Sequence, residues 1–192
     1  MSLSISMNKR QFLQRFLKEK KSIGAMAPSS KFLATKMLEN VNFKNTNIIV
    51  ELGPGTGIFT EKIISCMQEN SRLIIVELDE VFYNMLKDKI QHPKVEVVLG
   101  SASELPKLLS DRNIEFVDVI ISSLPLANFS TTLKSRILHS CRQSLNKKSG
   151  QFIQFQYTLR SHRLLKRVFP HVHIDFTVIN LPPAFVYTCK VS

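Results

Sequence analysis

The sequence has few cysteines and no long hydrophobic run, and these two absences exclude several classes of protein. No stretch of the 192 residues approaches the roughly 18 consecutive apolar residues that a membrane-spanning helix needs. The N-terminus has neither the continuous apolar stretch nor the cleavage site of a signal peptide. Cys66, Cys141 and Cys189 are odd in number and far apart. We therefore expect free thiols in a reducing compartment and no disulfide framework.

The sequence also lacks the ligand spacing of a metal site. His171 and His173 alternate along an expected strand, but no third ligand is evident for them. The other histidines have no carboxylate or cysteine at metal-ligand spacing. We interpret all five histidines as structural and expect no metal.

Acidic residues are scarce at both ends of the chain, and the formal net charge of the whole chain is +11. Residues 1–44 hold nine Lys/Arg and two Glu, a net charge of +7. Residues 45–133 hold seven Lys/Arg and twelve Asp/Glu, a net charge of −5. Residues 134–192 hold ten Lys/Arg and one Asp, a net charge of +9. Basic flanks indicate an anionic partner, either nucleic acid or an anionic membrane surface, and the alternative is a solvated basic surface.

The order of apolar segments predicts an α/β fold in a single domain. Strand patterns are expected at residues 47–52, 71–77, 94–99, 116–122, 151–157, 172–178 and 184–191. Helical patterns separate them at residues 58–69, 81–90, 104–110, 130–145 and 159–169. This alternation is typical of a Rossmann-like, mostly parallel sheet, here of seven strands with a C-terminal β-hairpin. Residues 45–192 are the expected core, and residues 1–44 are a basic helical extension.

Within the N-terminal extension, residues 8–20 are expected to form an amphipathic helix. Apolar side chains recur on one face, while Arg and Lys lie mostly elsewhere. The apolar residues are Phe12, Leu13, Phe16 and Leu17. Helices of this composition lie in membrane interfaces; the alternative is that this face packs on the domain itself.

The strongest motif is a glycine loop at the end of the first strand of the expected core. Gly53, Gly55 and Gly57 stand at every second position, whereas a dinucleotide fingerprint has its third glycine one residue later. Glu51 precedes the loop and would repel a pyrophosphate, but it suits a ligand with a cationic amine. Glu77 ends the second strand, where an acid accepts hydrogen bonds from ribose hydroxyls. Together these residues predict a cofactor with a ribose and an amino-acid tail.

This arrangement resembles the class I S-adenosylmethionine-dependent methyltransferases, whose first motif is an acid followed by Gly-x-Gly-x-Gly. The resemblance implies S-adenosylmethionine as the cofactor, with its tail and ribose held by Glu51 and Glu77. That family usually has Asp after the third strand, near the adenine. Here Ser101 and Ala102 occupy this place; we assign them, with Ser122 after the fourth strand, to the cofactor site.

The segment after the fourth strand is expected to bind the methyl acceptor. Adenine methyltransferases carry Asn/Asp-Pro-Pro-Tyr or Asn-Leu-Pro-Tyr there, and the aromatic ring stacks on a flipped base. This chain keeps Leu-Pro but has Ser123 in place of Asn and Leu126 in place of the aromatic residue. A stacking platform is worth roughly 1–3 kcal/mol per base. Its absence argues against a nucleic-acid acceptor.

The same segment is similar to that of bacterial phospholipid N-methyltransferases, which are relatives of the rRNA adenine dimethylases. Those enzymes carry Ser-Gly-Leu-Pro-Leu-Leu-Asn-Phe there, a basic N-terminal helix, a Gly-Ala-x-x-Pro-Ser-Ser segment and a Gln-Phe-x-Tyr strand. Here these motifs correspond to residues 122–129, 8–20, 24–30 and 154–157. The resemblance implies methylation of phosphatidylethanolamine towards phosphatidylcholine. It also implies anionic phospholipids as partners and a cytoplasmic enzyme peripherally associated with the inner face of the membrane.

The acceptor amine must lose its proton before attack, but the sequence shows no pair of groups that requires a dedicated base. The protein then mainly supplies alignment and desolvation. We expect Ser122, Ser123 or Asn128, together with carbonyls of the Leu124-Pro125 turn, to orient the amine. Tyr157 is expected to hydrogen-bond near the headgroup or to attract its cation through the ring. Basic side chains expected to hold the lipid phosphate are Arg160, Arg163, Lys166 and Arg167.

Two other interpretations stay open at the level of sequence. One is a methyltransferase acting on rRNA adenine or on a small-molecule amine, although the chain ends at Ser192 without the helical domain that rRNA dimethylases append. The other is a basic module that binds membrane or RNA without catalysis. Ser101 in place of the adenine-binding Asp favours that second interpretation.

Overall fold

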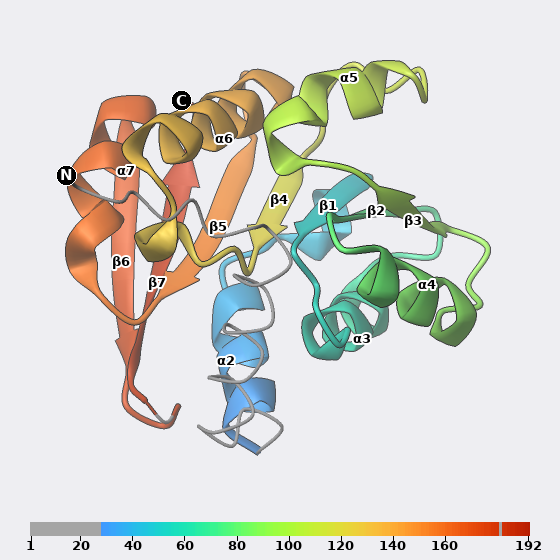
Figure 1. Cartoon of the computed structure of the whole chain (residues 1–192), viewed down its shortest axis with the longest axis horizontal. Coiled ribbons are helices and arrows are strands. Elements are labelled where there is room, and N and C mark those ends of the chain that lie inside the picture. The colour runs from blue at the N-terminus through green and yellow to red at the C-terminus, as the bar shows by residue number, and fades with distance from the viewer. Residues whose placement is uncertain (1–27, 181) are drawn as a thin grey trace, which may run out of the picture.

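A computed structural model describes residues 28–180 and 182–192, so the amphipathic helix expected at residues 8–20 lies outside the described residues. Seven strands form one sheet in the order β3-β2-β1-β4-β5-β7-β6 (Figure 1). They are β1 Ile48–Leu52, β2 Arg72–Glu77, β3 Val95–Leu99, β4 Val119–Ser122, β5 Gln151–Gln156, β6 His171–Thr177 and β7 Ala184–Lys190. The first five are parallel, and β7 pairs antiparallel with both β5 and β6. This confirms the expected Rossmann-like sheet with its closing hairpin.

Helices cover both faces of the sheet. Figure 1 shows α5, α6 and α7 above it and α2, α3 and α4 below it. The helices are α2 Pro28–Leu38, α3 Ile58–Cys66, α4 Glu80–Lys89, α5 Leu105–Ser110, α6 Thr131–Ser144 and α7 His162–Val168. Short 3₁₀ turns are η1 Phe43–Asn45, η2 Ala102–Glu104, η3 Leu126–Asn128 and η4 Leu159–Ser161. No helix in the described part of the chain is long and apolar enough to cross a bilayer.

The central strands are apolar on both sides because each face packs against helices. Val50, Ile74 and Ile120 belong to the core under α5 to α7, whereas the alternate residues Ile49 and Ile75 belong to the core against α2 to α4. This period of two in a sheet covered on both faces produces the near-continuous apolar runs seen in the sequence. The carboxyl ends of the parallel strands therefore form a shared edge where loops and polar side chains gather.

Two helix starts at this edge are fixed by capping side chains. Asp79 accepts hydrogen bonds from the backbone N–H groups of Val81 and Phe82 at the start of α4. Ser130 accepts from Leu133 N at the start of α6. Such caps satisfy N–H groups that have no partner within the helix. Both helices thus begin at defined places beside the strand ends.

Several predicted elements differ from the structure in their bounds; the helix expected at residues 58–69, for example, ends at Cys66. The strand expected at residues 116–122 begins at Val119, because Val117 makes an isolated bridge with Leu145 before β4 starts. The helix expected at residues 159–169 starts as the turn η4 and continues as α7. Periodicity alone does not separate a 3₁₀ turn from the first turn of an α-helix.

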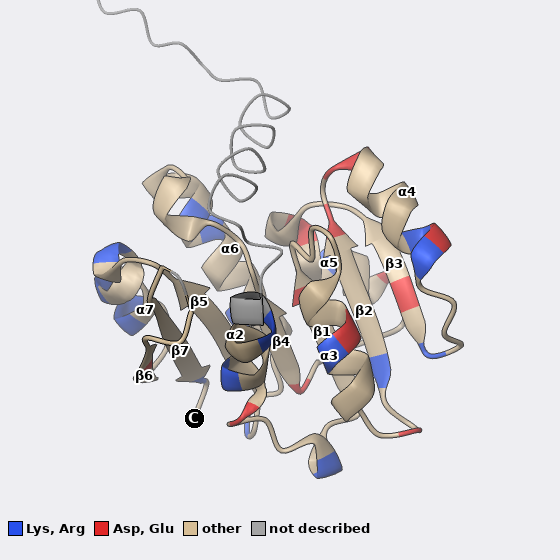
Figure 2. Cartoon of the chain, turned by 90° about the horizontal axis from the view of Figure 1, so that it is seen from below, with Lys and Arg blue, Asp and Glu red and all other residues tan. Residues whose placement is uncertain are grey.

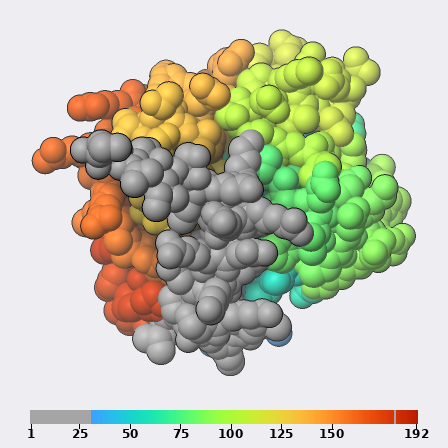
Figure 3. Space-filling model, viewed as in Figure 1, coloured from blue at the N-terminus to red at the C-terminus, as the bar shows by residue number. Residues whose placement is uncertain are grey.

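The acidic and basic parts of the sequence occupy different sides of the fold. Figure 2 shows basic but no acidic colour on α7, whereas acidic colour recurs around β2, β3 and α4. In the space-filling view, residues near 90 and residues near 165 lie at opposite margins of the visible face (Figure 3). The basic C-terminal part and the acidic middle part of the sequence thus lie on different sides of the molecule.

Candidate cofactor and acceptor site

The glycine loop joins β1 to α3 at the carboxyl edge of the sheet. Gly53, Gly55 and Gly57 have φ angles of 67°, 59° and 84°, in the left-handed region that side-chain-bearing residues rarely adopt. A Cβ at Gly53 would lie 2.7 Å from Leu124 Cδ2, whereas one at Gly55 would have no described atom within 4 Å. The loop therefore packs on the turn after β4 at Gly53 and faces open space at Gly55. A ligand fits against the backbone at that second point.

Glu51 lies on β1 just before this loop and is completely buried. Its Oε2 accepts a 2.6 Å hydrogen bond from Thr60 Oγ1, while Oε1 has no hydrogen-bond partner among the described residues. Burial raises the pKa of Glu51 to about 8; the Thr60 hydrogen bond lowers it and the charge of Glu77 raises it further. A buried acceptor without a partner is costly. This atom therefore fits a ligand that carries an ammonium group.

Glu77 closes the other side of the loop from the end of β2. Its Oε1 accepts from the backbone N–H groups of Leu78 and Asp79 at 2.8 and 3.0 Å, and its Oε2 accepts from Gly55 N at 3.4 Å. Burial raises the pKa of Glu77, while these backbone hydrogen bonds oppose the rise. Each carboxylate oxygen keeps acceptor capacity beyond these bonds. The acid is therefore held in place beside Gly55 and is able to accept from vicinal hydroxyls.

After β3, the two small residues that replace the expected Asp are used mainly in local structure. Ser101 begins η2, with its Oγ 3.3 Å from Ser103 N and 2.9 Å from Ser103 Oγ. Ala102 is buried in the core beneath α5 and α6. Ser140 of α6 donates to Ser103 O at 2.8 Å and fixes this turn. The structure thus places Ser101 and Ala102 at the expected strand end, without a carboxylate for an adenine amine.

The acceptor segment begins at the end of β4, directly beside the glycine loop. Ser123 N donates to Leu52 O at 3.0 Å, which joins the two segments. Ser122 is fully buried, and its Oγ accepts from Leu124 N at 3.4 Å. Ser123 Oγ is buried and has no partner within the described part of the chain. Of the two expected serines, Ser123 therefore has the hydroxyl that remains available to a ligand.

Two glutamines on β5 hold the acceptor segment, although the sequence pattern assigns them no role. Leu124 O accepts from Leu126 N at 2.8 Å, from Gln154 Nε2 at 3.0 Å and from Gln156 Nε2 at 3.1 Å. Gln156 Oε1 in turn accepts from Ala127 N at 3.2 Å. A carbonyl oxygen has two lone pairs, and these three donors share those of the Leu124 carbonyl. The expectation that the Leu124 carbonyl orients the amine stays a prediction, and the Leu124 side chain packs against Gly53.

The remaining expected residues form an exposed rim around this segment. Tyr157 follows β5, packs edge-on against Phe155 at 5.5 Å and is partly exposed. Burial raises the pKa of Tyr157, and a hydrogen bond with the side chain of Asn180 opposes that rise. Asn128 is exposed at the end of η3, and its backbone N donates to Pro125 O at 2.9 Å.

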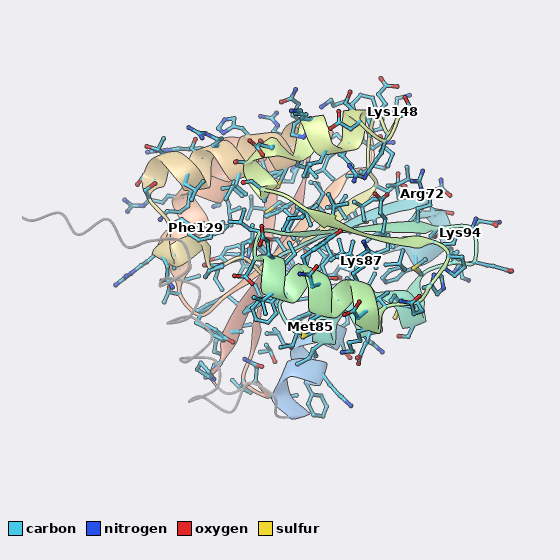
Figure 4. All side chains as sticks on the ribbon, turned by 45° about the vertical axis from the view of Figure 1, so that its right-hand side comes forward. Arg72, Met85, Lys87, Lys94, Phe129 and Lys148 are labelled. Atoms are coloured by element: carbon cyan, nitrogen blue, oxygen red, sulfur yellow. The ribbon has the colours of Figure 1, made fainter. Side chains whose placement is uncertain are left out.

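The expected phosphate-binding arginines lie beyond Tyr157 on the same side of the segment. Arg160 belongs to η4, which contacts η3, whereas Arg163 stands on α7, and both are exposed. Figure 4 shows which end of the molecule carries the carboxyl ends of the strands. Phe129, in the segment after β4, lies at that end. Arg72, Lys94 and Lys148 lie at the opposite end, at or near the amino ends of β2, β3 and β5. The loops that hold the expected site residues thus share one edge of the sheet. No group of three or more potential metal ligands occurs among residues 28–180 and 182–192.

Comparison with protein families gives a match over most of the chain. The profile described as ribosomal RNA adenine dimethylase matches residues 5–163. Ornithine lipid N-methyltransferase of Singulisphaera acidiphila is 33% identical over 181 residues, which are 93% of this chain and 94% of that protein. Ribosomal RNA small subunit methyltransferase A of a Hydrogenobaculum species is 30% identical over 63% of this chain, and the match covers 44% of that longer protein.

Solved structures share the fold at low sequence identity. A SAM-dependent methyltransferase from Aquifex aeolicus has a TM-score of 0.66 at 13% identity, covering 90% of this chain and 98% of that one. A second one, from Archaeoglobus fulgidus, has a TM-score of 0.65 at 17% identity, covering 92% and 99%. At these identities the likeness extends to the fold.

Proposed function

The chain belongs to the ribosomal RNA adenine dimethylase family and is a methyltransferase with S-adenosylmethionine as its cofactor, and we propose that its acceptor is the primary amine of a membrane-lipid headgroup. Phosphatidylethanolamine and an ornithine lipid both present such an amine. The observation that carries the proposal is the match to ornithine lipid N-methyltransferase over 93% of this chain and 94% of that enzyme. The rRNA methyltransferase match, in contrast, covers less than half of that relative.

The acceptor segment supports a lipid rather than a base. Leu126 stands where adenine methyltransferases have their stacking aromatic residue, and here it is completely buried in the core. The side chain therefore offers no flat surface to a base taken out of its helix. An aliphatic amine needs no such platform, only a hydrogen-bond acceptor and a dry, narrow approach to the methyl group.

The residues of the site fit the cofactor. Glu51 Oε1 is a buried acceptor for the ammonium of the amino-acid tail, Glu77 is an acceptor for the ribose hydroxyls, and Gly55 leaves room for both. When bound, S-adenosylmethionine supplies an activated sulfonium methyl group. Ser123 Oγ, buried and unpartnered in the described structure, is placed to accept a hydrogen bond from the neutral amine and orient its lone pair. Arg160 and Arg163 stand further out, where a headgroup phosphate would lie.

A second candidate acceptor is an adenine of rRNA. The family description favours it, and the basic surface of α7 is compatible with a phosphate backbone. Under this alternative, another part of the chain must supply the base-stacking surface that Leu126 does not.

One experiment separates the two acceptors. The full chain is incubated with labelled S-adenosylmethionine and, separately, with vesicles containing phosphatidylethanolamine, vesicles containing an ornithine lipid, and small-subunit rRNA. We expect the label in one or both lipids and none in the RNA, and the label in RNA alone would overturn the proposal. A Ser123→Ala variant tests the acceptor role: lipid methylation should fall while cofactor affinity is retained.

A further inference from the structure

The turn between β6 and β7 exposes aliphatic side chains to an unusual degree. Val178 and Ile179 are 69% and 64% exposed. Turns that face water are normally built from Gly, Pro, Asn, Asp and Ser, which hydrogen-bond locally or permit tight backbone bends. Other large apolar side chains are exposed nearby in sequence or structure. They are Phe176, on β6, and Tyr157 and Leu159, which follow β5.

The polar residue of this turn points the other way. Asn180 is 3% exposed, and its Nδ2 donates to Pro182 O at 2.7 Å. Its side chain also hydrogen-bonds with Tyr157. The turn is therefore braced from inside by a buried amide, while the side chains of Val178 and Ile179 are exposed.

Bracing by Asn180 also places the turn at the entrance of the acceptor segment. Tyr157 directly follows Gln156, whose side chain holds Leu124 O and Ala127 N. The aliphatic turn is thus connected to the acceptor segment through Gln156, the last residue of β5, and Tyr157, which follows it. Figure 1 shows the turn projecting from the sheet on the same side as α2.

The charged residues near the turn include few acids. Between Tyr157 and Ser192 the sequence has a single acid, Asp175, which lies 3.7 Å from Lys36 and is thereby balanced. Lys166 and Lys190 lie with His171 at the end of β6 away from the turn. Arg160 follows Tyr157 by three residues and is exposed. An exposed cation thus accompanies the exposed aliphatic side chains, as at the interface of an anionic bilayer, where apolar groups insert and cations meet phosphates.

We propose that the β6–β7 turn inserts Val178 and Ile179 into the interfacial layer of an anionic phospholipid bilayer, next to the lipid whose headgroup enters the acceptor segment. This inference rests on the proposed lipid acceptor and names the part of the protein surface that contacts the bilayer. Insertion at this place holds the acceptor segment at headgroup depth.

The absence of tryptophan from the chain allows a direct test. Ile179→Trp introduces a single tryptophan at the turn, and Phe116→Trp introduces one at an exposed apolar position before β4, at the opposite end of the strands. With vesicles of phosphatidylglycerol and phosphatidylethanolamine, the emission of the Ile179→Trp protein should shift to shorter wavelength and be quenched by brominated acyl chains. The Phe116→Trp protein should show neither change. Vesicle binding without a response at position 179 would overturn the proposal.

A second test measures the consequence for binding and activity. The double variant Val178→Ser with Ile179→Ser should bind the same vesicles about tenfold more weakly, as expected for losing partial burial of two aliphatic side chains. The matched control Phe116→Ser should bind as the wild type does. Thermal melting of all three proteins checks that the folds are equally stable. Unchanged binding by a folded double variant would contradict insertion.

The same variants separate this inference from the proposed function. Against aminolipid dispersed in detergent micelles, the double variant should retain wild-type methylation, because no bilayer has to be entered. Wild-type protein that methylates neither dispersed nor vesicular aminolipid would refute the lipid acceptor, whatever the fluorescence shows. Equal loss of activity in micelles and vesicles would show that the turn acts within the site, and would overturn its assignment as a membrane contact.

Discussion

At the scale of single residues, Glu51 combines complete burial with a carboxyl oxygen that has no described partner. Burial raises the pKa of Glu51 in the folded protein to about 8, above the ordinary value of 4.5. The folded protein therefore binds more protons than the unfolded chain between these values. Stability from this group is fully present below pH 4.5 and is lost as the pH rises to about 8. Ionised Glu51 thus destabilises the unliganded protein, and a cationic ligand that pairs with the carboxylate offsets this loss of stability.

Replacing Glu51 with Gln should remove this pH dependence. The free energy of unfolding of Glu51→Gln relative to wild type should rise as the pH increases from 4.5 to about 8, by on the order of 5 kcal/mol at the upper end. Calorimetry across this range measures it. Glu61→Gln, which removes an exposed carboxylate of α3 that pairs with Lys89 of α4, is the control. Parallel pH profiles for wild type and Glu51→Gln would contradict the assignment.

The three loop glycines differ in what surrounds them, and this predicts different effects of a methyl group. Gly55→Ala and Gly57→Ala should each lose roughly 1–2 kcal/mol of stability, because both φ angles are positive. A Cβ at Gly57 meets Leu86 at 2.9 Å, whereas one at Gly55 enters open space. Titration with S-adenosylmethionine should therefore show a large loss of affinity for Gly55→Ala and a smaller one for Gly57→Ala. Equal affinities in the two variants would place the cofactor elsewhere.

At the scale of elements, β5 controls the acceptor segment through the amides of Gln154 and Gln156. This contact joins a strand to a loop about thirty residues earlier, so it depends on the β4–β5 register that pairs Ser122 with Gln154. The two side chains hold the loop at backbone atoms, Leu124 O and Ala127 N. Its geometry is therefore open to change without loss of the cofactor site.

Gln156→Leu should separate catalysis from cofactor binding. The variant loses a donor to Leu124 O and the acceptor for Ala127 N, at roughly 1 kcal/mol for each hydrogen bond. We expect kcat to fall at least tenfold through misplacement of the segment, with S-adenosylmethionine affinity unchanged. Gln151→Leu, at the opposite end of the same strand, is the control. A fall in cofactor affinity of the same size would show that the two sites are not separable.

The sequence predicts the elements of this fold better than the connections between them. The spacing from Glu51 to Glu77 locates the cofactor site because both acids end adjacent parallel strands, and that adjacency follows from the βαβ order. The roles of Gln154 and Asn180 do not follow from any local pattern. Each acts on a residue brought near by sheet pairing, and an amide in a strand or turn looks the same in sequence whether it is braced or solvated. Likewise, no sequence pattern predicts that three donors converge on the Leu124 carbonyl, because two of them come from β5.

At the scale of the whole molecule, the basic N-terminal extension is the part whose role still depends on sequence alone. Its Phe, Leu, Arg and Lys pattern predicts contact with an anionic bilayer, and each basic residue near such a surface contributes about 1 kcal/mol.

Deleting residues 1–21 should therefore abolish binding to anionic vesicles while S-adenosylmethionine still binds. Sedimentation with vesicles and calorimetry with the cofactor measure the two properties on the same preparation. Vesicles of phosphatidylcholine alone serve as the control for charge. Undiminished sedimentation of the shortened chain would refute a membrane role for this extension.

The separation of charge between the two halves of the sheet bears on turnover. If the acceptor is the proposed membrane lipid, α7, which carries basic but no acidic colour in Figure 2, would face the anionic surface. The acidic residues around β2 and β3 would then face away from it, with the end of β2 and its Glu77 open to water. Under that proposal, the nucleoside would be exchanged without release of the enzyme from its lipid.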